Sequence, residues 1–174
     1  MSNYDFYDND PQEQLKAVVS EWLRSKADKK EIILDDYFSF DGKKYRRYLT
    51  PTLTKLIPDN YRVDGPEWRN HNYFYEITCN SGSLYIHLAF LYSKIEYNPN
   101  KDAILICEEI TKSKFSKSTR KPNRLWKWPH RSSTKKCDPY SKEDVFKVMD
   151  ELFEEMNKYE SDVLEDLRSK GVIK

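Results

Sequence analysis

The sequence NYFYEITCNSGSLYIHLAFLY, residues 72–92, is the strongest indication of the fold. It predicts two strands, residues 72–80 and 84–92, because aromatic and β-branched residues favour strands. Asn80-Ser81-Gly82-Ser83 is typical of the turn between them. Side chains of the second strand alternate between two faces, one with Leu84, Ile86, Leu88 and Phe90 and the other with Tyr85, His87, Ala89 and Leu91. Both faces are largely apolar or aromatic, so we expect an antiparallel hairpin whose second strand is central in its sheet.

Two helices are expected near the ends of the chain. Asp10-Pro11 is typical of a helix start, with Asp10 as the cap and Pro11 in the first turn. Apolar residues follow at helical spacing up to Trp22, and this helix should end within residues 25–30. Ser141 should cap a second helix, whose apolar stripe continues to Leu167. A stripe of that length must be buried, most simply on one face of the sheet.

The whole pattern predicts one α+β domain over residues 1–174. We expect an antiparallel sheet of about four to six strands, an N-terminal helix and a long C-terminal amphipathic helix packed on the sheet. Residues 1–10 should form a flexible N-terminus. Residues 103–110 fit a strand, and residues 102–112 fit a helix equally well. Further strands are expected at residues 32–34, 37–40 and 43–49, with a turn at Asp41-Gly42 and a short helix or turn at residues 52–57.

The net charge of +1 hides a strong asymmetry along the chain. The chain has 30 basic and 29 acidic residues. Residues 111–137 hold ten of the basic residues and no acid, whereas the segments before and after are acidic. Such an asymmetry of charge indicates what kind of partner a protein binds. The basic residues are Lys112, Lys114, Lys117, Arg120, Lys121, Arg124, Lys127, Arg131, Lys135 and Lys136.

The composition also indicates the cellular compartment of the protein. No apolar run is long enough to span a membrane, and the acidic N-terminus is unlike a signal peptide. Three widely spaced cysteines argue for a reducing, cytoplasmic location and against a disulfide framework or a zinc cluster. Cys79 and Cys107 should pack as small apolar groups in strands. Cys137 should be exposed, with a thiolate favoured by Lys135 and Lys136.

The segment 111–137 has no apolar period and reads as a long basic loop, with at most a short extended piece at residues 125–128. Its cations are interleaved with Trp126 and Trp128. Cations neutralise phosphates, and aromatic rings stack on unpaired bases. We therefore expect nucleic-acid binding by the residues Lys112, Lys114, Lys117, Arg120, Lys121, Arg124, Trp126, Lys127, Trp128 and Arg131.

Two other uses of the same segment stay open. It could be a solvated cover or dock on the chain's own acidic C-terminal helix, which carries Glu151, Glu154, Glu155 and Asp162. It could also bind an acidic surface of a protein partner, which would make the chain an interaction module.

Catalysis has little support in the sequence. Asp59 and Glu76 mimic the spacing of magnesium-binding carboxylates in nucleases, but Thr78 stands where such a site needs a lysine. The alternative is that Glu76 faces solvent on its strand. The three histidines, His71, His87 and His130, share no metal-ligand spacing, and His87 should be a hydrogen-bonded structural residue. We expect no metal, no cofactor and a function in binding more than in catalysis; the question of enzymatic activity stays open, with Asp59 and Glu76 as the candidates for a divergent nuclease.

The order of several motifs is similar to that of a known region. These motifs are Gly65-Pro66-Glu67-Trp68, Tyr73-Phe74-Tyr75-Glu76-Ile77, Leu84-Tyr85-Ile86-His87-Leu88 and Leu125-Trp126-Lys127-Trp128. Residues 50–168 resemble the C-terminal accessory region behind PD-(D/E)XK nuclease domains in prokaryotic defence and mobile-element proteins. The resemblance implies an accessory role and transfers no activity to this chain.

Overall fold

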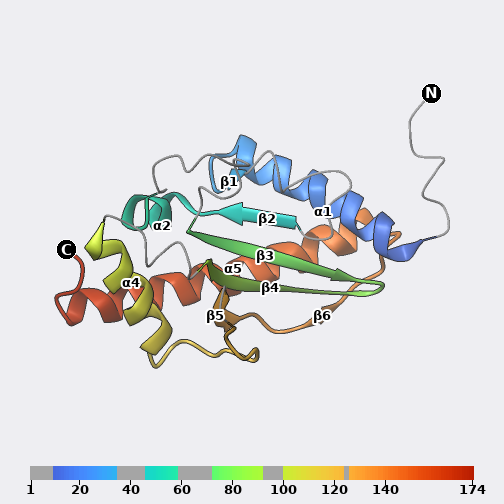
Figure 1. Ribbon diagram of the computed structural model, residues 1–174. Helices are drawn as coiled ribbons and strands as arrows, with labels where there is room; N and C mark the ends of the chain where they lie inside the picture. The colour runs from blue at the N-terminus through green and yellow to red at the C-terminus, as the bar shows by residue number, and fades with distance from the viewer. Residues whose placement is uncertain (1–9, 35–45, 59–71, 92–99, 124–125) are drawn as a thin grey trace, which may run out of the picture.

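The structure is a computed structural model that describes residues 10–34, 46–58, 72–91, 100–123 and 126–174 (Figure 1). Within these ranges the fold is α+β, as predicted. Its helices are α1 (Pro11–Asp28), α2 (Pro51–Leu56), α4 (Lys101–Lys112) and α5 (Lys142–Ser169). Its strands are β1 (Ile33–Leu34), β2 (Arg46–Leu49), β3 (Tyr73–Asn80), β4 (Ser83–Leu91), β5 (Trp126–Arg131) and β6 (Lys135–Lys136).

The sheet is antiparallel, with the order β1-β2-β3-β4-β5, and β6 also pairs with β4. The predicted hairpin is confirmed: β3 and β4 pair from Asn80↔Ser83 at the turn to Tyr73↔Phe90. Since β4 pairs with β3 on one side and with β5 and β6 on the other, it is central in the sheet, as expected.

One face of the sheet packs on helices, and we call it the helix face. The Arg46 guanidinium donates to Ser20 of α1, and the Tyr48 ring contacts Phe153 of α5 edge-on. Figure 1 shows α5 running behind the sheet. The residues that share this face across the strands are Arg46, Tyr48, Tyr73, Tyr75, Ile77, Cys79, Leu84, Ile86, Leu88, Phe90 and His130.

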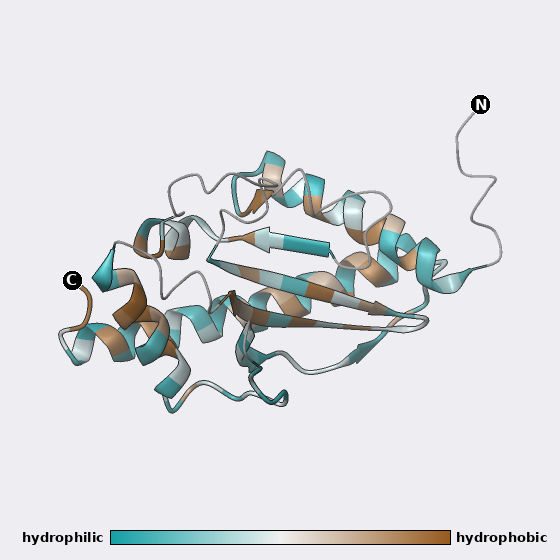
Figure 2. Cartoon of the chain, in the orientation of Figure 1, coloured by the Kyte–Doolittle hydropathy of each residue, from teal (hydrophilic) through white to brown (hydrophobic). Residues whose placement is uncertain are grey.

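The opposite face, which we call the aromatic–polar face, carries the alternate side chains of the same strands. Figure 2 shows brown, hydrophobic positions alternating with paler and teal ones along β3 and β4. The cross-strand register and the ring contacts place on this face Arg47, Phe74, Glu76, Thr78, Tyr85, His87, Ala89, Leu91, Trp126, Trp128 and Arg131.

The caps explain where the helices begin. The Asp10 carboxylate accepts a 2.9 Å hydrogen bond from the Gln12 amide, and the Ser141 hydroxyl accepts one of 3.2 Å from Asp144. Gly171 has a φ of 70°, a left-handed conformation that ends α5 and suits glycine. Asn100 caps α4 by accepting from the Asp102 and Ala103 amides, so the open choice over residues 102–112 is decided for a helix.

The basic segment is more ordered than the sequence predicts. Its residues 126–131 form β5, which pairs with β4 from Leu91↔Trp126 to His87↔Arg131. The register shifts between Leu88 and Phe90, which is the kind of irregularity that accommodates Pro129 in a strand. A proline and the lack of an apolar period hid this strand, because its stability comes from pairing with β4.

Some predictions fall outside the described residues. These are the flexible N-terminus over residues 1–9, the extended piece at residues 37–40, the turn at Asp41-Gly42, and the sites Asp59, His71 and Arg124. Among the helices that the structure describes, none is long and apolar enough to cross a membrane.

Candidate nucleic-acid interface

Four polar side chains form one row across the aromatic–polar face. Arg47 of β2 is the register partner of Glu76 on β3, Glu76 is the partner of His87 on β4, and His87 is the partner of Arg131 on β5. Cross-strand partners share a face and have neighbouring Cβ atoms. The fold therefore brings a carboxylate, an imidazole and two guanidiniums from four strands together.

The first half of the row is an internal ion pair. Arg47 donates from Nη2 at 2.6 Å and from Nε at 2.9 Å to the same oxygen of Glu76, and both side chains are buried. The guanidinium also lies 4.7 Å from the Phe74 ring centre. Glu76 therefore does not face solvent, and its carboxylate neutralises a buried cation. In the described part of the chain no group of three or more metal-ligating side chains occurs.

The second half of the row is electropositive. His87 is only 4% exposed, and burial, together with the charges of Arg120 and Arg131, lowers its pKa to about 4. The His87 ring meets the Tyr85 ring edge-on, and the Arg131 guanidinium lies 4.0 Å from the Tyr85 ring centre. Both His87 Nδ1 and Arg131 Nε are buried without a hydrogen-bond partner in the described structure. The expectation of a hydrogen-bonded structural histidine is therefore wrong at Nδ1.

Two tryptophans flank this row. Trp126 and Trp128 are half-buried and stack on each other, with ring centres 6.5 Å apart and an interplanar angle of 21°. Trp126 also contacts Phe74. The exposed Arg120 places its guanidinium 4.5 Å from the Trp128 ring centre. The two tryptophan rings therefore form a stacked pair, and the Arg120 cation covers the Trp128 ring.

The predicted cations divide into two groups. Lys114, Lys117, Arg120 and Lys121 are exposed, and none of them forms an ion pair with a carboxylate that the structure describes. Lys112 lies 3.4 Å from Glu109 in α4. Lys127 and Arg131 are half-buried in β5, and Arg124 lies outside the described residues. The exposed group thus lies in the stretch 114–121, just before the two tryptophans.

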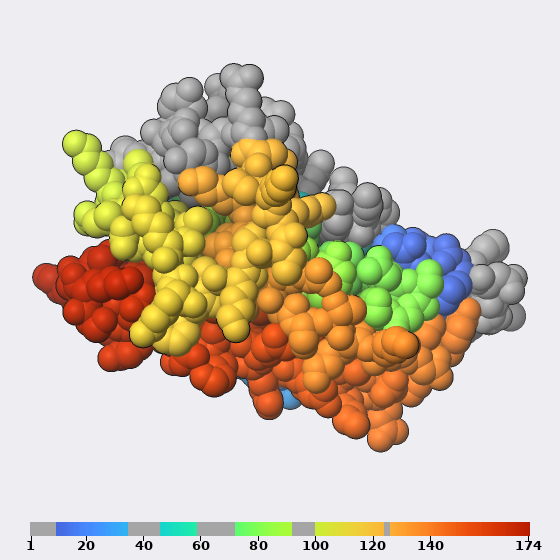
Figure 3. All heavy atoms as spheres, turned by 90° about the horizontal axis from the view of Figure 1, so that it is seen from below, coloured from blue at the N-terminus to red at the C-terminus, as the bar shows by residue number. Residues whose placement is uncertain are grey.

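The rest of the segment docks on α5, as the intramolecular alternative anticipated. The His130 ring lies parallel to the Tyr159 ring, with centres 3.7 Å apart. Nδ1 of His130 accepts from the Lys117 amide at 3.2 Å, and burial lowers the pKa of His130 to about 4. Figure 3 shows the yellow residues of this segment lying against the red half of α5 and beside the orange residues of β5.

Hydroxyl groups make many of the other contacts to α5. Ser113 donates to Asp166 at 3.0 Å, and the hydroxyl and amide of Ser133 both donate to Glu155. One predicted cation takes part, because Lys135 lies 2.8 Å from Glu151. Docking therefore uses Glu151, Glu155 and Asp166 and leaves the cations of 114–121 outside these ion pairs.

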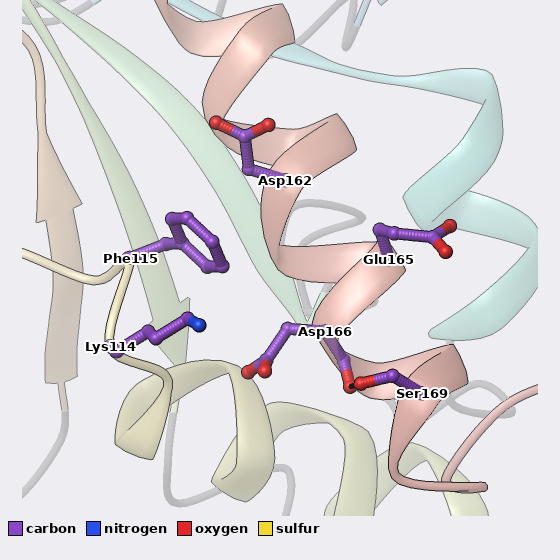
Figure 4. Close-up of a pocket in the computed structure, with 6 residues that line it drawn as sticks. All are labelled: Lys114, Phe115, Asp162, Glu165, Asp166 and Ser169. Carbon is purple, nitrogen blue, oxygen red and sulfur yellow. Dashed lines mark hydrogen bonds between the residues drawn. The ribbon is translucent and has the colours of Figure 1, made fainter.

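A shallow groove runs between the segment and α5. One part has a volume of about 370 Å³ and is lined by cations such as Lys117 and Lys158 and by the carboxylates of Glu155 and Asp162. A neighbouring part of about 240 Å³ appears in Figure 4, where the Lys114 ammonium points toward Asp166 and Glu165 points away. Charges of both signs line the groove, so it does not favour an anion as the aromatic–polar face does.

The cysteines do not form a reactive centre. All three are free. Cys137 is half-buried, and burial, together with Asp144 and Asp138, raises the pKa of its thiol to about 11. The expected thiolate is therefore wrong, because burial and the two nearby carboxylates disfavour the charged thiolate. Cys107 lies in α4 and not in a strand.

No protein-family model, curated protein or solved structure matches the chain. The resemblance to a PD-(D/E)XK accessory region stays a prediction.

Proposed function

We propose that this protein binds nucleic acid, without catalysing a reaction on it, through the segment 111–137. One observation carries the proposal. Four exposed cations, Lys114, Lys117, Arg120 and Lys121, form no described ion pair with a carboxylate and lie directly before a stacked pair of tryptophans. Arg120 connects the two features, because it is one of the exposed cations and covers Trp128.

The physical chemistry of each group fits a phosphate polymer. Lysine and arginine release counterions when they neutralise phosphates, and this release supplies affinity that does not depend on sequence. Aromatic side chains stack on bases and add affinity for each base. The Glu76 carboxylate on the same face is already paired with Arg47.

An acidic surface of a protein partner is the competing ligand for the same cations. Nucleic acid is the better fit, since the paired tryptophans offer ring faces of the kind that bases stack on. Co-purification of a stoichiometric protein that survives nuclease treatment, with no retained oligonucleotide, would favour the interaction module instead.

The wider setting of the proposal is a prokaryotic or phage defence system, with the protein in the cytoplasm as an accessory to a nuclease. The resemblance over residues 50–168 supports this role. The three free cysteines support a reducing compartment.

Binding is tested by fluorescence anisotropy with labelled DNA and RNA at several salt concentrations. We expect the logarithm of the affinity to fall linearly with the logarithm of the salt concentration. Replacing Lys117, Arg120 and Lys121 together by alanine should make that line shallower. The matched control replaces Lys29, Lys55 and Lys147, three exposed lysines outside the segment, and should leave the slope unchanged. Absence of binding at low salt would overturn the proposal.

A further inference from the structure

The aromatic–polar face contains an unsatisfied electropositive spot inside the proposed interface. His87 and Arg131 are register partners, and each has a buried nitrogen without a described hydrogen-bond partner. Buried polar groups are usually hydrogen-bonded, so two orphans on adjacent strands need an explanation. The carboxylate next in the row, Glu76, is already bound to Arg47. An oxyanion bound beside these two groups would compensate the charges of Arg120 and Arg131 that act on His87.

This electropositive spot, formed by His87 and Arg131, lies beside the stacked pair of tryptophans. Ala89, the face neighbour of His87 two residues along β4, lies at the irregular position opposite Trp128 and Pro129. Residues two apart on a strand are separated by about 6.6 Å, so the spot and the Trp128 ring are close neighbours. Arg120 belongs to both, because it covers Trp128 and its charge acts on His87.

We infer that the bound nucleic acid is single-stranded, with one base stacked on Trp128 and an adjoining phosphate held by Arg120 and Arg131, beside the buried His87 imidazole. The inference rests on the proposed function and deepens it. The base takes the place of the Arg120 guanidinium on the ring, and the displaced guanidinium turns to the phosphate. Arg120 can make this change because it is exposed, and its described hydrogen bonds are backbone bonds to the Ser118 hydroxyl.

A duplex does not fit this arrangement. Its bases hide their faces in the stack, so a side chain reaches them only after a base is extruded. Trp128 is a half-buried residue of a paired strand and cannot reach into a duplex. A single strand can lay an unpaired base on such a ring and run its backbone along the cations.

The experiment compares single strands and duplexes of equal length, in DNA and RNA, by anisotropy at one salt concentration. We expect the single strand to bind at least tenfold more tightly than the duplex. Trp128→Ala should weaken single-strand binding about tenfold and duplex binding much less. Trp128→Phe keeps a ring and should restore most of the affinity. Lys121→Ala, which removes only a charge, should weaken the binding of single strand and duplex by the same factor. Chemical denaturation of each variant confirms that it folds.

A second measurement detects the bound phosphate through the pKa of the His87 imidazole. We follow its titration by NMR in the free protein, with a saturating single strand, and with a strand of abasic nucleotides. A phosphate compensates the charges of Arg120 and Arg131, so both ligands should raise the pKa of His87 by at least one unit above its value of about 4.

The outcomes separate the two proposals. Failure to bind any nucleic acid would overturn both the proposed function and this inference. Equal affinity for single strand and duplex, or an unchanged His87 titration at saturation, would overturn the inference and leave nucleic-acid binding intact.

Discussion

The Tyr75 hydroxyl on β3 donates a 2.6 Å hydrogen bond to the Glu160 carboxylate on α5. The Thr50 hydroxyl donates to the same oxygen at 2.8 Å. Glu160 is 8% exposed, and burial raises the pKa of its carboxyl group. These two bonds tie α5 to β3 and to Thr50, the residue that follows β2, through a buried polar contact.

The first prediction concerns this tie. Tyr75→Phe should lower the free energy of unfolding by about 1–2 kcal/mol, because the buried carboxyl group loses one of its two described donors. Urea denaturation at pH 7 measures the change. The control is Tyr140→Phe: Tyr140 is 58% exposed, and its loss should change stability by less than about 0.5 kcal/mol. Equal effects of the two variants would contradict the role given to Tyr75.

The second prediction concerns the charge of Glu160. Its pKa in the folded protein lies above the ordinary value of 4.5, so its contribution to stability is fully present below pH 4.5 and is lost as the pH rises through the folded pKa. Glu160→Gln keeps an acceptor for Tyr75 and does not titrate. The wild type should therefore lose stability relative to this variant as the pH rises from 4 to 7. A difference that stays constant over this range would disprove the raised pKa.

Glu160 also illustrates a limit of sequence patterns. The stripe of α5 is defined by residues such as Met156, Tyr159 and Val163, and a glutamate between them reads as solvated. Its burial depends on two hydroxyls, from Tyr75 and Thr50, that are far away in the chain. The helix and its buried face could be predicted from local spacing, but the partner of a single polar residue could not.

Part of the polar row could be predicted from the sequence. The turn between Asn80 and Ser83 fixes the hairpin register, and that register alone places Glu76 opposite His87. The contributions of Arg47 and Arg131 were not predictable, because they come from strands whose pairing is set by tertiary contacts. β5 in particular joins β4 across 35 residues or more of chain, with a proline in its middle.

The third prediction concerns acid stability. The pKa of His130 is about 4 in the folded protein and 6.5 ordinarily, so the fold holds the neutral ring. That contribution is complete above pH 6.5 and is lost as the pH falls from 6.5 to 4. His130→Phe retains a ring against Tyr159 and does not titrate. We expect urea denaturation at pH 7, 5.5 and 4.5 to show a smaller acid loss in this variant than in the wild type. Parallel pH profiles would count against His130; His87 is present in both proteins and does not affect the comparison.

The fourth prediction concerns the thiols. Burial raises the thiol pKa of Cys79 and Cys107 to about 12, and Cys137 has a pKa of about 11. Because the thiolate is the reactive form, iodoacetamide should modify the folded protein slowly at pH 7.5 and rapidly in urea. Mass spectrometry of digests assigns the modified sites. Modification of Cys137 at pH 7.5 as fast in the native as in the unfolded protein would show that Lys135 and Lys136 dominate its environment after all.

The last prediction compares two lysines of the same segment. Lys117 has no described carboxylate partner, whereas the Lys135 ammonium lies 2.8 Å from Glu151. If Lys117 meets a phosphate, Lys117→Ala should reduce the slope of log affinity against log salt by about 0.7 for a single strand. Lys135→Ala removes the same charge but should leave the slope unchanged, because its counterion is already a carboxylate of α5.

The reverse pattern would be equally informative. A reduced slope for Lys135→Ala would mean that binding frees Lys135 from Glu151 and that the segment undocks from α5 when the ligand arrives. Glu151→Gln separates these cases, because it frees Lys135 without removing it. If the segment stays docked through the hydrogen bonds between Ser133 and Glu155, Glu151→Gln should add one cation to the interface. The slope of log affinity against log salt should then become steeper. An unchanged slope would place Lys135 beyond the reach of the ligand.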